Sequence, residues 1–119
     1  MPKPTTTSTI DVTEHMLRAT RVLNDIDGDM TVQQLRVLLE VACGLGDQTA
    51  REITNRMGVS PGTVSRALDL WSGYGTGEKP GRNLIDRVED LDDRRNKLLR
   101  LTKRGEKFIS SLCESPAHE

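Results

Sequence analysis

Aromatic residues and excess charge are both scarce in this chain of 119 residues. One Phe, one Trp and one Tyr are too few for the stacking platforms that bind RNA or single-stranded DNA. The formal net charge is −1, so no overall positive field attracts a nucleic acid. No apolar run approaches the roughly 18 residues of a membrane-spanning helix. The N-terminal stretch MPKPTTTST also lacks the apolar core of a signal peptide.

Metal-ligating and nucleophilic side chains are few as well. The two cysteines, Cys43 and Cys113, are far apart and lack metal-type spacing, which favours a reduced, cytoplasmic protein. His15 stands alone in a helical segment and His118 lies near the C-terminus. No set of nucleophile, base and orienting group can be assembled from these residues. We therefore expect no enzyme, no metal and no cofactor.

The centre of the chain is typical of two short helices joined by a tight turn. Thr49, followed three residues later by a glutamate, predicts a capping box at the start of the first helix. Gly58 suits the left-handed residue that follows a helix end. Ser60 can cap the second helix, and Pro61 occupies its first position, where no N–H is needed. Such a pair predicts a helix-turn-helix.

The second helix of this pair is amphipathic. At about 100° per residue its apolar side chains share one face, and small or hydrogen-bonding residues point away. Arg matches guanine, and Ser or Thr can pair with several base edges, so the outward face suits the major groove. The alternative is a solvated face of an ordinary helix pair. The inward set is Val64, Ala67, Leu68 and Trp71, and the outward set is Gly62, Thr63, Ser65, Arg66 and Asp69.

Two more helices are predicted before this pair. Residues 1–9 are expected to form a disordered arm, and a helix follows over Ile10–Ile26. Its apolar residues recur every four and three positions, a narrow seam that faces either its own core or a second subunit. Thr31 and Gln34 predict a capping box for a helix to about Cys43. The buried candidates in that second helix are Val32, Leu35, Leu38, Leu39 and Ala42.

A β-hairpin is predicted after the helix pair, with strands at Leu84–Glu89 and Lys97–Leu101. Ile85 and Val88 have opposite parity, so we expect a bulge or a loose edge in the first strand. Thr102 can cap a last helix whose inward residues are Phe108, Ile109 and Leu112.

Basic residues gather at the hairpin and after it. Seven fall between positions 94 and 107, against one acid, Glu106. A local basic patch of this kind indicates a nucleic-acid partner. A helix-turn-helix followed by a basic-tipped hairpin is a winged helix. The seven are Arg94, Arg95, Lys97, Arg100, Lys103, Arg104 and Lys107.

Four segments between Thr31 and Gly105 follow a recognisable order. They are TVQQLRVLLEVA, AREITNRMGVSPGTVSRALDLW, LIDR and DDRRNKLLRLTKRG. The most specific piece is Asp93-Arg94-Arg95 followed by Leu101-Thr102 and Gly105. Together they resemble the winged-helix regulators of the MarR (multiple antibiotic resistance regulator) family. The resemblance implies a dimeric DNA-binding regulator, most often a repressor, whose helix at residues 60–71 reads the major groove. It also implies that Arg95 enters the minor groove and that Asp93 helps to hold it.

The chain departs from the family pattern in two places. The insertion TGEKPGRN precedes the first hairpin strand. It either brings Lys79 and Arg82 to the DNA backbone or forms a solvated loop. The sequence also ends soon after Cys113, where the family continues with a long dimerisation helix. A homodimer would then use residues 10–26 and the last helix, or dimerisation would be weak. A small-molecule effector has no support in these residues.

We thus predict a mainly α fold with a small β-hairpin (α+β), a winged helix-turn-helix. Residues 10–30 form an N-terminal helix and dimerisation element, 31–112 the DNA-binding domain and 113–119 a flexible tail. The predicted function is sequence-specific binding of double-stranded DNA in transcription regulation. The alternative is a winged-helix protein-interaction module in a replication, segregation or packaging assembly. The predicted DNA-binding residues are Ser60, Gly62, Thr63, Ser65, Arg66, Asp69, Lys79, Arg82, Asp93, Arg94, Arg95 and Lys97.

Overall fold

A computed structural model describes residues 5–44, 48–73, 81–89, 92 and 97–113. These residues form a mostly helical fold with a small antiparallel sheet, as predicted. In chain order the elements are α1 (Thr5–Ile26), α2 (Val32–Cys43), β1 (Gln48–Thr49), α3 (Ala50–Met57), α4 (Pro61–Trp71), β2 (Ile85–Glu89), β3 (Lys97–Leu101) and α5 (Lys103–Cys113).

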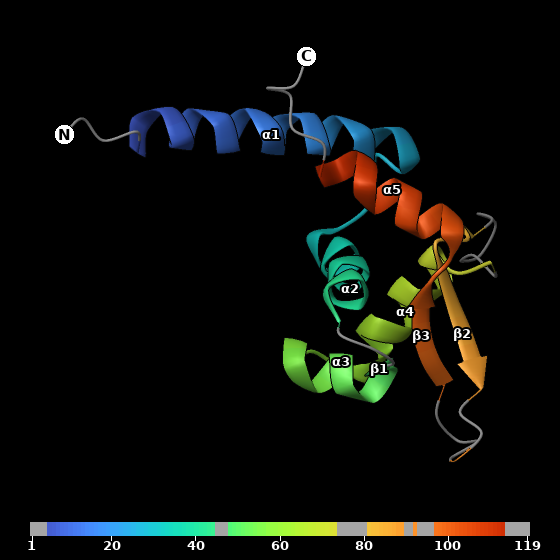
Figure 1. The fold of residues 1–119 in the computed structure, drawn as a ribbon. Coiled ribbons are helices and arrows are strands. Elements are labelled where there is room, and N and C mark those ends of the chain that lie inside the picture. Colours follow the sequence, from blue (N-terminus) through green and yellow to red (C-terminus); the bar gives the residue numbers. More distant parts are fainter. Residues whose placement is uncertain (1–4, 45–47, 74–80, 90–91, 93–96, 114–119) are drawn as a thin grey trace.

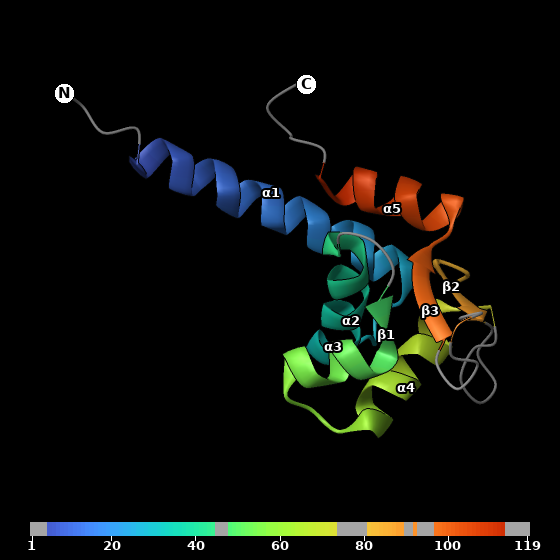
Figure 2. The same ribbon diagram turned by 60° about the horizontal axis from the view of Figure 1, so that its bottom comes forward.

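The elements divide the molecule into two ends (Figure 1). Helix α1 runs along one side with α5 beside it, and its N-terminal part extends past the rest of the molecule. Helices α3 and α4 and the β2–β3 hairpin lie at the opposite end, and α2 stands between (Figures 1 and 2). The helix-turn-helix and the hairpin are therefore presented together, away from α1.

The first helix starts earlier than predicted. It begins at Thr5 rather than Ile10, so residues 5–9, expected to belong to a disordered arm, are helical. Asp11 and Glu14, acidic residues of the kind that favour the first turn of a helix, lie inside α1 and do not mark its start. Threonine and serine disfavour a helix interior by less than about 0.7 kcal/mol per residue, and the Thr13 hydroxyl donates to the carbonyl oxygen of Thr9 at 2.8 Å.

Helix α2 has the predicted boundaries and capping box, but a different buried face. Val37, Leu38 and Val41 form its core face, whereas Val32 is 80% exposed and Leu39 is 39% exposed. Predicting Val32 and Leu39 as buried was wrong. Apolar residues surround most of this helix, so periodicity alone cannot select the face that packs.

Helix α4 packs on α2 and forms the centre of the core. Trp71 is completely buried, and its indole N–H donates to the carbonyl oxygen of Gln34 in α2 at 2.6 Å. A buried indole needs such an acceptor. The inward face predicted for α4 is confirmed, because the following residues are all buried: Val64, Ala67, Leu68 and Trp71.

The helix-turn-helix has the predicted local structure. Thr49 and Glu52 form the reciprocal capping box at the start of α3, and Gly58 ends that helix in the left-handed conformation with φ of 68°. Ser60 then caps α4 by accepting from the N–H of Thr63, with Pro61 at the first helical position. Short-range capping chemistry therefore sets both ends of the turn.

The sheet has the strand order β1-β3-β2. The two-residue strand β1, which the sequence did not predict, pairs Gln48 with Leu99 of β3. The β2–β3 register runs without interruption from Ile85 opposite Leu101 to Glu89 opposite Lys97, so the bulge expected in β2 is absent from these pairs. β2 is an edge strand, and Val88 is only half-buried there. Ile85 and Val88 can therefore lie on opposite faces of the strand without a bulge.

Helix α5 closes the fold against the hairpin. The Thr102 hydroxyl accepts from the N–H of Gly105 at 2.8 Å, which is the predicted N-cap contact. Leu112 is buried, and Phe108 and Ile109 are partly buried against the core. Within the described ranges, no helix is long and apolar enough to cross a membrane, and no group of three metal-ligating side chains forms.

Candidate nucleic-acid interface

The N-terminal half of α4 presents a surface of small polar residues. Ser60, Ser65 and Arg66 are exposed, and Gly62 and Thr63 are half-buried beside them. The Ser60 hydroxyl accepts from the N–H of Thr63 at 3.2 Å and shares a hydrogen bond with the Thr63 hydroxyl at 2.9 Å. The helix end is thus held in a defined geometry while its side chains remain accessible.

Arg66 is the long cationic side chain on this surface. A Cβ built on Gly62 would lie 3.3 Å from Nη1 of Arg66. The guanidinium therefore folds back over the first turn of α4, where the absence of a side chain at position 62 leaves it room. A guanidinium in this position can offer paired donors to a guanine or a phosphate.

Asp69, by contrast, is engaged within the protein. Its Oδ1 atom accepts from Nη2 of Arg87 in β2 at 2.6 Å, and the same nitrogen lies 3.3 Å from the hydroxyl of Ser72. The sequence predicts that Asp69 contacts DNA and predicts no role for Arg87. The two residues lie 18 positions apart, and no local pattern connects them.

Arg82 is engaged at the other end of α4. Its Nη2 atom lies 3.7 Å from Oδ2 of Asp27, whose side chain is 7% exposed. The backbone N–H of Arg82 donates to the carbonyl oxygen of Leu70 at 2.9 Å. This arginine therefore joins the end of α1 to the end of α4, an arrangement that the sequence analysis did not foresee.

A groove of about 540 Å³ separates the helix pair from the hairpin. Its walls include Arg51 of α3, Ser65 of α4, Arg87 of β2 and Lys97 of β3. Lys97 is exposed at the start of β3, so cationic side chains from three elements converge here. Four of the predicted contacts fall outside the described residues, namely Lys79, Asp93, Arg94 and Arg95.

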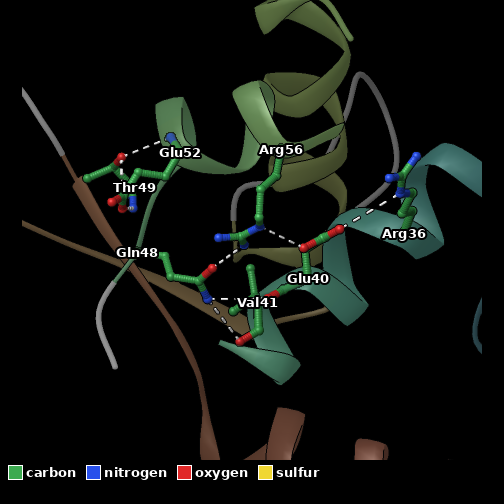
Figure 3. A network of polar contacts seen from close by, with 7 residues as sticks. All are labelled: Arg36, Glu40, Val41, Gln48, Thr49, Glu52 and Arg56. Carbon is green, nitrogen blue, oxygen red and sulfur yellow. Dashed lines mark hydrogen bonds and ion pairs between the residues drawn. The ribbon is translucent and has the colours of Figure 1, made fainter. Parts of the chain in front are cut away.

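A polar network holds α3 against α2 and the sheet (Figure 3). The buried Gln48 side chain donates to the carbonyl oxygens of Glu40 and Val41 at 3.3 and 3.4 Å, which satisfies acceptors at the end of α2. Arg56 of α3 donates to the Gln48 side chain and, at 3.0 Å, to the Glu40 carboxylate. Arg36 lies 3.8 Å from the same carboxylate. The network fixes the first helix of the pair, against which α4 packs.

Comparison with known proteins agrees with the resemblance found in the sequence. A profile of the MarR family matches residues 28–72, which include α2, α3 and α4. A comparison with curated proteins finds no match. The family resemblance predicted above is therefore confirmed over the helix-turn-helix.

Solved structures extend the likeness to the whole fold. The transcriptional regulator Tm0710 from Thermotoga maritima is similar with a TM-score of 0.69 and 20% identity, over 98% of this chain and 75% of that chain. RV1404 from Mycobacterium tuberculosis gives 0.64 and 21%, over 96% and 81%. A MarR mutant from E. coli, complexed with operator DNA, gives 0.58 and 22%, over 85% and 67%. At these identities the likeness establishes the winged-helix fold.

Proposed function

We propose that this chain is a sequence-specific regulator of transcription that binds double-stranded DNA and acts as a repressor. Helix α4 enters the major groove, and the hairpin reaches the neighbouring minor groove. The observation that carries this proposal is the exposed first half of α4, where small polar residues surround one guanidinium. The hairpin lies at the same end of the molecule (Figure 1), and one structural neighbour is complexed with operator DNA.

The side chains divide into three groups in this proposal. Thr63, Ser65 and Arg66 read base edges in the major groove. Phosphates are met by the N-terminus of α4 at Ser60 and Gly62. The hairpin supplies the minor-groove contact through Arg95, which Asp93 helps to hold, and the phosphate contacts of Arg94 and Lys97. Lys79, in the insertion before β2, meets a further phosphate. Because Asp69 and Arg82 are each ion-paired within the protein, we assign them to positioning rather than to direct contact.

We further propose that the chain acts as a homodimer through α1 and α5. Four large apolar residues on α1 are each more than half exposed, although burial of such side chains is strongly favourable. They lie in the first two thirds of α1, whose N-terminal part extends past the rest of the molecule (Figure 1). Two reading heads on one face of DNA would contact half-sites about 10 to 10.5 base pairs apart. The four residues are Ile10 at 53%, Val12 at 57%, Met16 at 61% and Leu17 at 52% exposure.

A mobility-shift titration on duplexes selected from a random pool tests the DNA-binding role. Arg66→Ala should weaken binding by about 1–3 kcal/mol and relax the preference at one base position. Arg36→Ala is the matched control, because Arg36 is an exposed arginine on α2, outside the proposed reading and dimer surfaces, and its 3.8 Å ion pair with Glu40 is exposed and contributes little. Equal binding by wild type and Arg66→Ala would refute the assigned reading surface.

Salt dependence separates this function from a protein-interaction module. A protein that contacts several phosphates loses affinity steeply between about 50 and 200 mM salt. An apolar contact with another protein changes little over that range. A flat salt dependence of the measured complex would therefore favour the interaction module.

A further inference from the structure

Backbone hydrogen bonds join helix α4, the proposed recognition helix, to the hairpin at their base. Where α4 passes toward β2, the N–H of Asn83 donates to the carbonyl oxygen of Ser72 at 3.0 Å, and the N–H of Leu84 donates to that of Trp71 at 2.7 Å. Beyond this base, Ile85 and Leu99 of the hairpin share the hydrophobic core with α4. A polar contact between the two elements lies at the edge of that core.

The ion pair between Asp69 and Arg87 lies across this angle. Asp69 precedes the end of α4 by two residues, and Arg87 is the third residue of β2. The 2.6 Å separation is that of a short, charge-assisted hydrogen bond. The Ser72 hydroxyl, in a residue that is 2% exposed, lies 3.3 Å from the same nitrogen. Arg87 therefore connects the hairpin to the helix at two points.

Helix α4 and the β2–β3 hairpin are each held rigidly enough for this ion pair to fix their relative orientation. Arg87 lies opposite Leu99 in the uninterrupted β2–β3 register, and Leu99 is 2% exposed. Helix α4 is held by its buried residues, among them the fully buried Val64 and Trp71. Because each element is anchored in the core, a contact between them can fix their relative orientation. A contact between two mobile segments could not.

We propose that the Asp69–Arg87 pair is a brace that sets the angle between the recognition helix and the hairpin, and that Arg87 is a positioning residue for DNA binding. This inference rests on the function proposed above, because the angle decides whether both elements reach neighbouring grooves together. The pair has a second consequence for the same surface. It neutralises a carboxylate on the helix that faces DNA, where an unpaired Asp69 would repel phosphate.

The competing role for Arg87 is direct contact with a phosphate, and Asp69→Asn separates the two. If Arg87 contacted phosphate, removing the Asp69 charge would release the arginine and strengthen binding. If the pair is a brace, Asp69→Asn should weaken binding about fivefold or more, as coupled groups do when one is removed. Arg87→Met should weaken binding at least as much, because it also leaves the Asp69 carboxylate unpaired, and the double variant should lose no more than the weaker-binding single variant.

The slope of log affinity against log salt gives an independent readout. Loss of one phosphate contact lowers its magnitude by about 0.9, so Lys97→Ala, an exposed cation at the start of β3, serves as the comparator. The double variant, which leaves neither an unpaired carboxylate nor a freed arginine, should leave the slope unchanged. Tighter binding by Asp69→Asn, or a slope reduced by about one in the double variant, would overturn the brace and leave the proposed function intact.

Residual dipolar couplings of backbone amides test the brace without DNA. In the wild-type protein, couplings from α4 and from β2–β3 should fit one relative orientation. In Asp69→Asn each element should keep its internal fit while their common orientation is lost. An unchanged common orientation would overturn the brace even if no duplex were bound, whereas failure of the wild type to select any duplex would refute the proposed function itself.

Discussion

Gly105 cannot accept a larger side chain unless α5 moves. A Cβ built on this residue would overlap the carbonyl oxygen of Leu84 and approach the Leu101 side chain at 3.3 Å. The same carbonyl accepts from the N–H of Thr102 at 3.0 Å, directly before the helix. We therefore expect Gly105→Ala to destabilise the fold, although alanine is the better helix former.

The expected change in unfolding free energy has three contributions, of which two destabilise the fold and one stabilises it. Overpacking a tight site costs about 1–3 kcal/mol. Weakening the Thr102–Leu84 hydrogen bond costs about 1 kcal/mol more, and the helix preference of alanine over glycine offsets about the same amount. The expected net loss of unfolding free energy is about 1–3 kcal/mol. With about 2.1 cal/mol/K per residue over 119 residues, Tm should fall by about 4–12 °C.

Thermal melting followed by circular dichroism measures this shift, and urea unfolding gives the free energy. Gly62→Ala is the matched control, because the closest atom to its added Cβ is the flexible end of Arg66 at 3.3 Å. That variant should melt at or slightly above the wild-type temperature, as helical Gly-to-Ala changes without steric conflict do. A Gly105→Ala protein that melts with or above the wild type would refute the close approach of α5 to Leu84.

Three further substitutions test contacts that stabilise the helix-turn-helix and the elements around it. Trp71→Phe leaves the carbonyl oxygen of Gln34 without its indole donor and should reduce the urea-derived unfolding free energy by about 1–3 kcal/mol; an unchanged midpoint would refute the contact. Asp27→Asn removes the charge that faces the partly buried Arg82 and should lower Tm, whereas the same substitution at the exposed Asp25 should not. Thr49→Ala removes the α3 cap and should reduce stability by about 1 kcal/mol in urea unfolding, with Thr49→Ser retaining most of it.

The helix-turn-helix was predictable because its determinants are local. The capping residues Thr49 and Ser60, the left-handed Gly58 and the helix-starting Pro61 each act within one turn of their own position. Their residue types alone therefore identify the helix ends. The inward face of α4 was equally clear, because polar and apolar residues alternate there with a helical period.

Apart from the start of α1, the failures of prediction concern distant partners. The face of α2 depends on which of several apolar sides meets α4, and Val37 rather than Val32 does so. Strand β1 is only two residues long, and it exists because Leu99 and Leu98 lie opposite it. The pairs Asp69–Arg87 and Asp27–Arg82 join residues separated by many positions. No local rule encodes such contacts, because tertiary packing selects them.

The Asp69–Arg87 ion pair also reduces the number of α4 side chains that are available to contact bases. Asp69 is held by Arg87, and the following residues of the helix are buried. In the proposed complex, base reading therefore rests on Thr63, Ser65 and Arg66. At 1.5 Å of rise per residue these positions span about 4.5 Å of helix axis, which corresponds to one or two base-pair steps. One well-placed guanidinium supplies about 1–3 kcal/mol of discrimination, far below the roughly 4–10 kcal/mol that separates specific from non-specific sites. In the proposed function the remaining specificity comes from the hairpin in the minor groove and from a second copy on the opposite half-site. The proposed brace angle and the proposed dimer through α1 are therefore both requirements of that function.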